Sequence, residues 1–252
     1  MRILTALLIL GLSLGGCGYK LGYRHFSDPI VPATGHSSAE FVVADDRSIT
    51  FTKDRLEVSI VPLTSEELNR HFTPHSQVPE GFAEPNPYTA ADNPYTYGDW
   101  NPPGEDKAPE RFTVFLLRVK NYAFPKVLLA PENMSIVSAN GWNYQVLSQS
   151  ALIEYYFPYA VAYGGNARQK FEERTDILRR TLFRDEMVFS GQEYEGFVVF
   201  PVLDHDVEEF TVWVEDMALR FDFRGEPTEK IDIPFRFVRE TYYARHARDG
   251  AQ

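Results

Sequence analysis

The sequence predicts an all-β fold, an antiparallel β-sandwich with one inserted amphipathic helix and one long proline-rich loop. Through most of residues 40–238, apolar residues alternate with polar ones, which is the period of strands that bury one face. A hydrophobic share of 44% with 14% aromatic residues is typical of a chain that buries a core. With a single cysteine, this core has to hold the fold without an internal disulfide bond.

The start of the chain has the pattern of a secretory signal. Arg2 supplies a positive charge, and an apolar run at residues 3–14 is shorter than the roughly 20 residues that span a bilayer. The small residues that follow complete the motif Leu14-Gly15-Gly16-Cys17, which resembles the lipobox of bacterial lipoproteins. The resemblance implies that residues 1–16 are removed as a signal peptide and that Cys17 is acylated, with palmitate as a typical chain.

Localisation and partners follow from this resemblance and from the charge. In the lipoprotein family, aspartate after the cysteine tends to signal retention in the inner membrane, whereas Gly18 stands here. The resemblance therefore favours the outer membrane if the source is Gram-negative. The net charge of −11 disfavours nucleic acid as a partner. We expect the chain to attach to the membrane through its lipid, to bind another envelope protein and to use no cofactor.

The chain divides into four segments after the signal. Residues 17–38 predict a lipidated tether, because Pro29, Pro32 and Gly35 break regular structure. Its 21 residues after Cys17 would reach about 70 Å when stretched, or about 25 Å as a flexible coil. A single β-sandwich domain is predicted at 39–240, and a flexible polar tail at 241–252.

The first part of the domain carries local signals for strands and a short helix. Alternating apolar residues predict strands within 41–43, 49–51 and 56–60. Thr64 and Glu67 have the spacing of a capping box, which predicts a helix at 65–72 that ends before Pro74.

Residues 73–110 form a loop that is rich in proline and aromatic residues. Eight of the 17 prolines fall there, and proline cannot donate a hydrogen bond to a strand or helix. Its aromatic side chains that could contact a partner or ligand are Tyr88, Tyr95, Tyr97 and Trp100. Two interpretations are open: the segment is a recognition loop, or it packs on the domain and covers a sheet edge.

The second part of the domain has the densest strand signals. Residues 112–119 are apolar on both faces, which predicts a central strand. Asn140-Gly141 lies between the apolar runs 134–138 and 142–147, which predicts a hairpin whose two turn residues both have positive φ.

Two segments follow the hairpin. Residues 151–163 are rich in aromatic residues but interrupted by Pro158, so their secondary structure stays open. Apolar residues at Ala167, Phe171, Leu178 and Leu182 predict an amphipathic helix at 167–183, with Asn166 as its N-cap.

The late strands carry a second resemblance. Ser190-Gly191 followed by the apolar run 196–201, together with the strand at 112–121, resembles the immunoglobulin-like accessory domains of bacterial lipoproteins. The resemblance covers residues 110–238 and implies an immunoglobulin-like β-sandwich. Further strands are predicted from the alternation within 210–214, 219–223 and 231–237, with a turn at Gly225-Glu226-Pro227.

The sequence offers no catalytic motif, and we assign no catalytic residue and no metal ligand. The nucleophile elbow, the zinc-protease motif and the phosphate-binding loop have no match. His71 and His75 have the spacing of two ligands on one helix face, but Pro74 interrupts that helix. Asp204-His205-Asp206 is more typical of a polar turn than of a cation site.

Three functions remain, in order of preference. The first is a membrane-anchored envelope lipoprotein that is not an enzyme and acts in protein interaction or assembly. The second is a glycan- or peptidoglycan-binding module that uses the aromatic segment 82–100. The third is a hydrolase with dispersed carboxylates such as Glu154 or Glu195, which requires two acids in one cleft.

Overall fold

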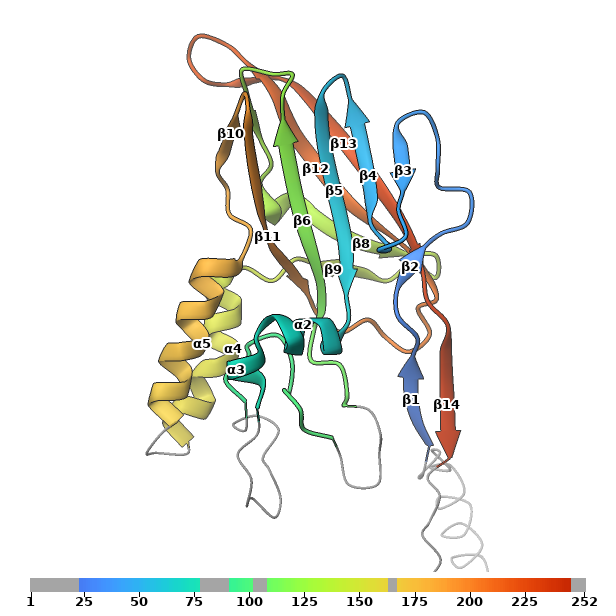
Figure 1. Cartoon of the computed structure of the whole chain (residues 1–252), viewed down its shortest axis with the longest axis vertical. Helices are drawn as coiled ribbons and strands as arrows, with labels where there is room; N and C mark the ends of the chain where they lie inside the picture. The colour runs from blue at the N-terminus through green and yellow to red at the C-terminus, as the bar shows by residue number, and fades with distance from the viewer. Residues whose placement is uncertain (1–22, 78–90, 102–107, 163–166, 246–252) are drawn as a thin grey trace, which may run out of the picture.

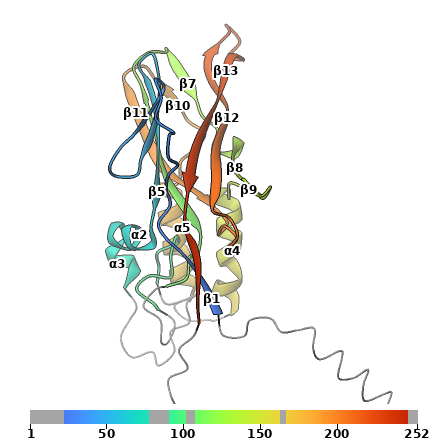
Figure 2. The same cartoon turned by 90° about the vertical axis from the view of Figure 1, so that its right-hand side faces the viewer.

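Two antiparallel β-sheets and a layer of helices make up the computed structural model (Figure 1; Figure 2). The structure describes residues 23–77, 91–101, 108–162 and 167–245. The predicted signal peptide, Cys17, Tyr88, Asn166 and the last seven residues lie outside this part of the chain. The prediction of a mostly β fold with antiparallel sheets is confirmed.

The first sheet of the described chain has five strands in the order β11-β6-β5-β4-β3. They are β3 (Phe41–Val43), β4 (Ile49–Lys53), β5 (Leu56–Leu63), β6 (Thr113–Asn121) and β11 (Gln192–Phe200). The predictions of strands near residues 41, 49 and 56 are confirmed, and so is the central place of β6, between β5 and β11.

The second sheet follows the order β10-β7-β12-β13-β2, and β8 and β9 extend it from β12. Its strands are β2 (Val31–Pro32), β7 (Lys126–Leu128), β8 (Met134–Ser138), β9 (Asn143–Gln145), β10 (Met187–Phe189), β12 (Glu209–Phe221) and β13 (Pro227–Val238). A short 3-10 helix, η1 (Pro131–Asn133), precedes β8.

The central strands of the first sheet are buried on both faces because they separate two hydrophobic clusters. In β6, Phe115 and Leu117 point into the core between the sheets, whereas Val114 contributes to the second cluster, under the helices. In β11, Val198 and Phe197 divide in the same way. Successive side chains of a strand point to opposite faces, so apolar residues at every position are required here.

The helical layer is larger than the sequence predicts. It contains α2 (Ser65–His71), α3 (Thr73–Ser76), α4 (Gln149–Ala162) and α5 (Ala167–Thr181). The predictions of α2, with its capping box, and of α5 are confirmed. The prediction of a single inserted helix is wrong, because the segment left open around Pro158 is helical and packs against α5. Pro74 lies in the first turn of α3, where its missing N–H has no helical partner to lose.

Two local predictions need correction although the elements exist. The β8–β9 hairpin forms, but only Gly141 of its turn has positive φ, which fits a three-residue loop rather than a two-residue turn. The two strands predicted within 210–223 are one strand, β12, with a bulge after Val214. Asp216 adopts a φ of 57° in this bulge, and its N–H bonds to the side chain of Asp232 at 2.8 Å.

Described parts of the predicted tether and of the predicted tail pair with each other as strands. Strand β1 (Tyr23–Ser27) pairs antiparallel with β14 (Thr241–Arg245). The N–H of Asp28 then bonds to the carbonyl of Glu240 at 2.9 Å, and β2 continues along β13. Strands β1 and β14 form a two-stranded sheet of their own, which we call the stem. Figure 1 and Figure 2 both place it at one end of the long axis.

Candidate functional site: a groove at the base of the sandwich

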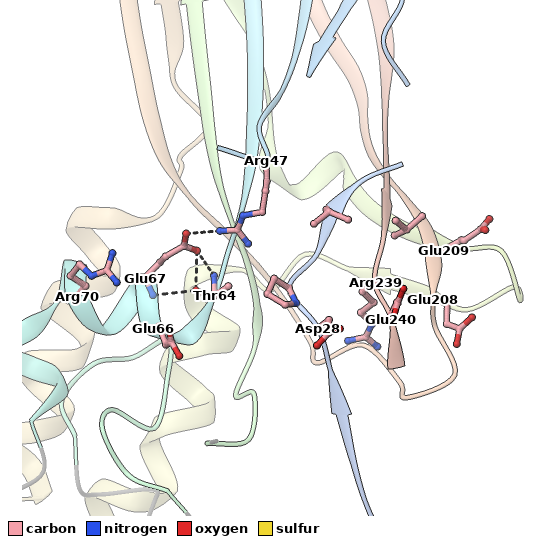
Figure 3. A pocket seen from close by; sticks show the side chains of 13 residues that line it. Asp28, Arg47, Thr64, Glu66, Glu67, Arg70, Glu208, Glu209, Arg239 and Glu240 are labelled. Atoms are coloured by element: carbon pink, nitrogen blue, oxygen red, sulfur yellow. Dashed lines mark hydrogen bonds and ion pairs between the residues drawn. The ribbon is translucent and has the colours of Figure 1, made fainter. Parts of the chain in front are cut away.

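A hollow of about 1020 Å³ lies where the two sheets part, next to the stem. We call it the basal groove (Figure 3). Its lining comes from five places: the start of β2, the turn before β4, α2 with its N-cap, the start of β12, and the end of β13. The lining residues are Asp28, Pro29, Val31, Arg47, Thr64, Glu66, Glu67, Arg70, Glu208, Glu209, Val238, Arg239 and Glu240.

One wall of the basal groove is fixed by the N-cap of α2. Glu67 accepts hydrogen bonds from the backbone N–H of Thr64 at 2.8 Å and from its hydroxyl at 2.9 Å, and it pairs with Arg47. Burial opposes ionisation of Glu67, but these hydrogen bonds and the nearby guanidinium outweigh it and lower its pKa. Glu67 is therefore a structural carboxylate, and it is ill suited to act as a general acid.

The opposite wall is held by a buried guanidinium. Arg239 donates to the carbonyls of Val207 at 2.8 Å, Leu203 at 3.1 Å and Asp204 at 2.6 Å, all in the loop before β12. Its pKa is lowered by burial, which the charge of Glu110, at 3.7 Å, opposes. These bonds keep the loop and β13 together, so the wall is rigid.

The remaining acids of the basal groove face solvent. Within the described chain, Asp28, Glu66 and Glu240 take part in no ion pair. Six carboxylates line the groove against three arginines, and two of those arginines already pair with acids. The groove thus combines a negative rim with an apolar surface supplied by Pro29, Val31 and Val238.

The aromatic side chains predicted to contact a ligand are not brought together as one surface. Tyr95 is only 1% exposed, packs on Phe197 and shares a hydrogen bond with Thr181, so its predicted contact role is wrong. Tyr97 and Trp100 are half-buried, with their ring centroids 6.2 Å apart. Segment 91–101 therefore packs on the helical layer, as the cover interpretation predicts.

Other sequence candidates lie elsewhere. Glu195 pairs with Arg118 on the exposed sheet face, and Glu154 lies on α4, so neither lines the basal groove. Asp204 accepts a hydrogen bond from Tyr144 at 2.7 Å, which makes its segment a pinned polar turn.

The histidine pair is also separated. His71 ends α2 and packs on Phe197, whereas His75 lies in α3. One possible ligand atom each of His75, Asp92 and Glu173 lies within 4.8 Å of the others, a grouping that sequence spacing could not indicate. The ammonium of Lys170 lies 3.2 Å from Asp92 and pairs with this one of the two acids in the cluster.

Comparison with protein-family models, with curated proteins and with solved structures finds no match to this chain. None of the helices in the described ranges is both long and apolar enough to cross a bilayer.

Proposed function

We propose that this chain is a lipid-anchored envelope protein that binds another envelope protein in its basal groove and is not an enzyme. The observation that carries the proposal is the stem. It leads from the groove toward the lipobox, and only six residue steps separate Cys17 from Tyr23. Six steps span at most about 20 Å, so acylated Cys17 would hold the stem end close to the membrane.

The position of the groove along the chain supports the same assignment. Asp28, which lines it, is eleven residue steps from Cys17, so the groove opens at most about 40 Å from the lipid. A partner at this level is another membrane-associated protein or one held at the membrane surface. The groove's charge favours a segment of that partner with lysine or arginine beside an apolar side chain.

An immunoglobulin-like sandwich is part of the proposal. The two sequence segments that carry this resemblance become neighbouring strands, β6 and β11, paired from Asn121 opposite Gln192 to Thr113 opposite Phe200. By analogy of fold, such a domain offers a partner rigid sheet faces and loops, which suits a binding role.

Photo-crosslinking in intact cells tests the proposal. A photoreactive amino acid replaces Glu209, an exposed acid of the groove, and in a control it replaces Glu226, an exposed acid in the β12–β13 turn. We expect a discrete protein adduct from position 209 only, and its loss when Cys17→Ser prevents lipid attachment. The same adducts from both positions, or an undiminished adduct in the Cys17→Ser chain, would contradict the proposal.

A further inference from the structure

Helix α4 is an unusual surface helix because only Glu154 of its 14 residues is charged. A helix that is apolar all round is normally buried. One side of α4 is indeed buried, through Leu152 and Tyr156 in the cluster under the helices. Another side faces solvent with two large apolar residues four positions apart: Phe157 is 57% and Val161 70% exposed.

This exposed face lies toward the end of the molecule that the proposed anchor holds. The C-terminal end of α4 and the start of α5 reach the same end of the long axis as the stem (Figure 1; Figure 2). Cys17 precedes the stem by six residue steps, a reach of at most about 20 Å. A membrane that holds acylated Cys17 would therefore face the tip of α4.

We propose that the C-terminal half of α4 inserts into the surface of the membrane that anchors the chain. Phe157 and Val161 would enter the boundary of the acyl chains, to a depth of ~5–10 Å. This inference rests on the lipid anchor proposed above.

The neighbouring charges are compatible with a lipid surface. The next described residues, at the start of α5, include Arg168, which pairs with Glu172 at 3.0 Å and has a largely exposed side chain that can also reach phosphate groups. The acids of the basal groove lie on the other elements near the stem, away from α4. Two attachments, the acyl chains and the helix tip, fix the tilt of the domain and hence the direction in which the groove opens.

The test uses a fluorescent label that reports depth in a membrane. Val161→Cys introduces a thiol at an exposed position, and in the lipidated chain the sulfur of Cys17 is acylated and does not react. The thiol carries a nitrobenzoxadiazole label, and the protein is reconstituted into phosphatidylcholine–phosphatidylglycerol vesicles with or without brominated acyl chains. The matched control is Phe223→Cys, at a 91% exposed apolar residue in the β12–β13 turn, which Figure 1 places at the opposite end.

We expect brominated lipid to lower the fluorescence of the Val161→Cys label to roughly half or less, as for a group ~5–10 Å below the surface. The Phe223→Cys label should stay unchanged. Equal fluorescence of the Val161→Cys label in the two kinds of vesicle would overturn the inference. The inference would also be overturned if the label at position 161 had a blue-shifted emission in cells and crosslinked to a protein, while brominated lipid did not quench it in vesicles. A protein, and not the membrane, would then cover this face.

A parallel measurement separates this inference from the proposed function. Labelled palmitate and vesicle flotation report whether Cys17 anchors the chain. A chain that takes up no palmitate contradicts the anchor itself, whereas an acylated, floating chain with an unquenched label contradicts only the insertion of α4. A double variant, Phe157→Ser with Val161→Ser, should restore accessibility of the region to aqueous quenchers while circular dichroism stays unchanged.

Discussion

Glu67 has three partners that each favour its ionised form. The N-cap hydroxyl and N–H of Thr64 and the guanidinium of Arg47 all contact its carboxylate. A neutral side chain could keep only part of this set. The residue thus links the capping of α2 to the wall of the basal groove.

Glu67→Gln should reduce the free energy of unfolding by about 1 kcal/mol at neutral pH, as for loss of a cap and a partly exposed ion pair. Because the folded pKa of Glu67 is lowered, its contribution is complete above the unfolded value of 4.5 and is lost as pH falls through the folded pKa. Urea denaturation of the wild-type chain and of Glu67→Gln should therefore give a difference in unfolding free energy that is smaller at about pH 3 than at about pH 7. An equal difference at both would contradict the assignment.

Tyr95 contributes a ring and a hydroxyl to the cluster under the helices. Its ring lies 5.2 Å from that of Phe197, centroid to centroid, and its hydroxyl bonds to Thr181. Tyr95→Ala should lower the free energy of unfolding by about 3–5 kcal/mol, whereas Tyr95→Phe should lower it by about 1 kcal/mol. Urea denaturation of both variants separates packing from hydrogen bonding; similar losses would show that the ring is not buried.

Residues whose partners are local could be predicted from the sequence, and residues with distant partners could not. Thr64 and Glu67 contact each other three residues apart, so their spacing was sufficient. Tyr95, Tyr97 and Trp100 look alike in the sequence. Their different exposure depends on Asn93, a buried side chain that bonds to Ser76 at 3.0 Å and fixes the segment on α3.

At the scale of elements, periodic patterns indicated most strands and α5, and failed where tertiary contacts decide. Helix α4 has no polar face, so no period of 3.6 could reveal it, and packing of Leu152 and Tyr156 compensates for Pro158. Strand β12 was divided in two because its bulge depends on Asp232 of the next strand. The basal groove could not be predicted at all, because its lining comes from five separate stretches of the sequence.

The backbone of Leu182 and Phe183, which follow α5, approaches strand β11 closely at Gly196. A Cβ there would lie 2.5 Å from the backbone nitrogen of Phe183, whose N–H bonds to the carbonyl of Phe197 at 2.9 Å. Gly196→Ala should therefore lower the free energy of unfolding by about 1–3 kcal/mol through forced backbone shifts. Thermal unfolding of Gly196→Ala checks this, with Glu195→Ala as the control. Glu195 lies on the exposed face, so its replacement should change the free energy of unfolding by less than about 1 kcal/mol. Equal stabilities would mean that the contact is loose.

The glycan-binding hypothesis now depends on Tyr97 and Trp100 within the described chain. Both are half-buried, and the guanidinium carbon of Arg111 lies 4.1 Å from the centroid of Tyr97. Since we propose that the binding site is the basal groove, Tyr97→Ala with Trp100→Ala should leave retention on insoluble peptidoglycan unchanged. A clear loss of retention, with unchanged thermal stability, would move the function to this segment.

At the scale of the whole molecule, residues 23–27 and 241–245 form one ribbon. Because residues 23–27 belong to this ribbon, only the segment before them is left as the proposed tether, and its reach is shorter. No local pattern predicts that residues near 23 pair with residues near 245, because the pairing joins opposite ends of the chain. Truncation after Glu240 should remove the partner of β1 while the core stays folded. Hydrogen exchange should then lose protection at residues 23–27 only; loss of protection across the sheets would contradict this.

The charge of the basal groove gives a second prediction at this scale. Glu66→Lys with Glu240→Lys reverses two unpaired acids of its rim and should reduce the adduct formed from position 209 by about tenfold. The control is Glu226→Lys, which changes the net charge in the β12–β13 turn, away from the groove. It should leave the yield of the adduct unchanged. An equal reduction by the control would mean that only overall charge matters.

The pairing of β1 with β14 also sets an order in time. A chain is made from its N-terminus, so β1 exists from the beginning but has no partner until almost the last described residue has been added. Through that interval β1 lacks the strand with which it pairs, while the strands that precede β14 in the chain can already pair with one another. Completion of the stem therefore requires residues 241–245, which are made after every other described strand.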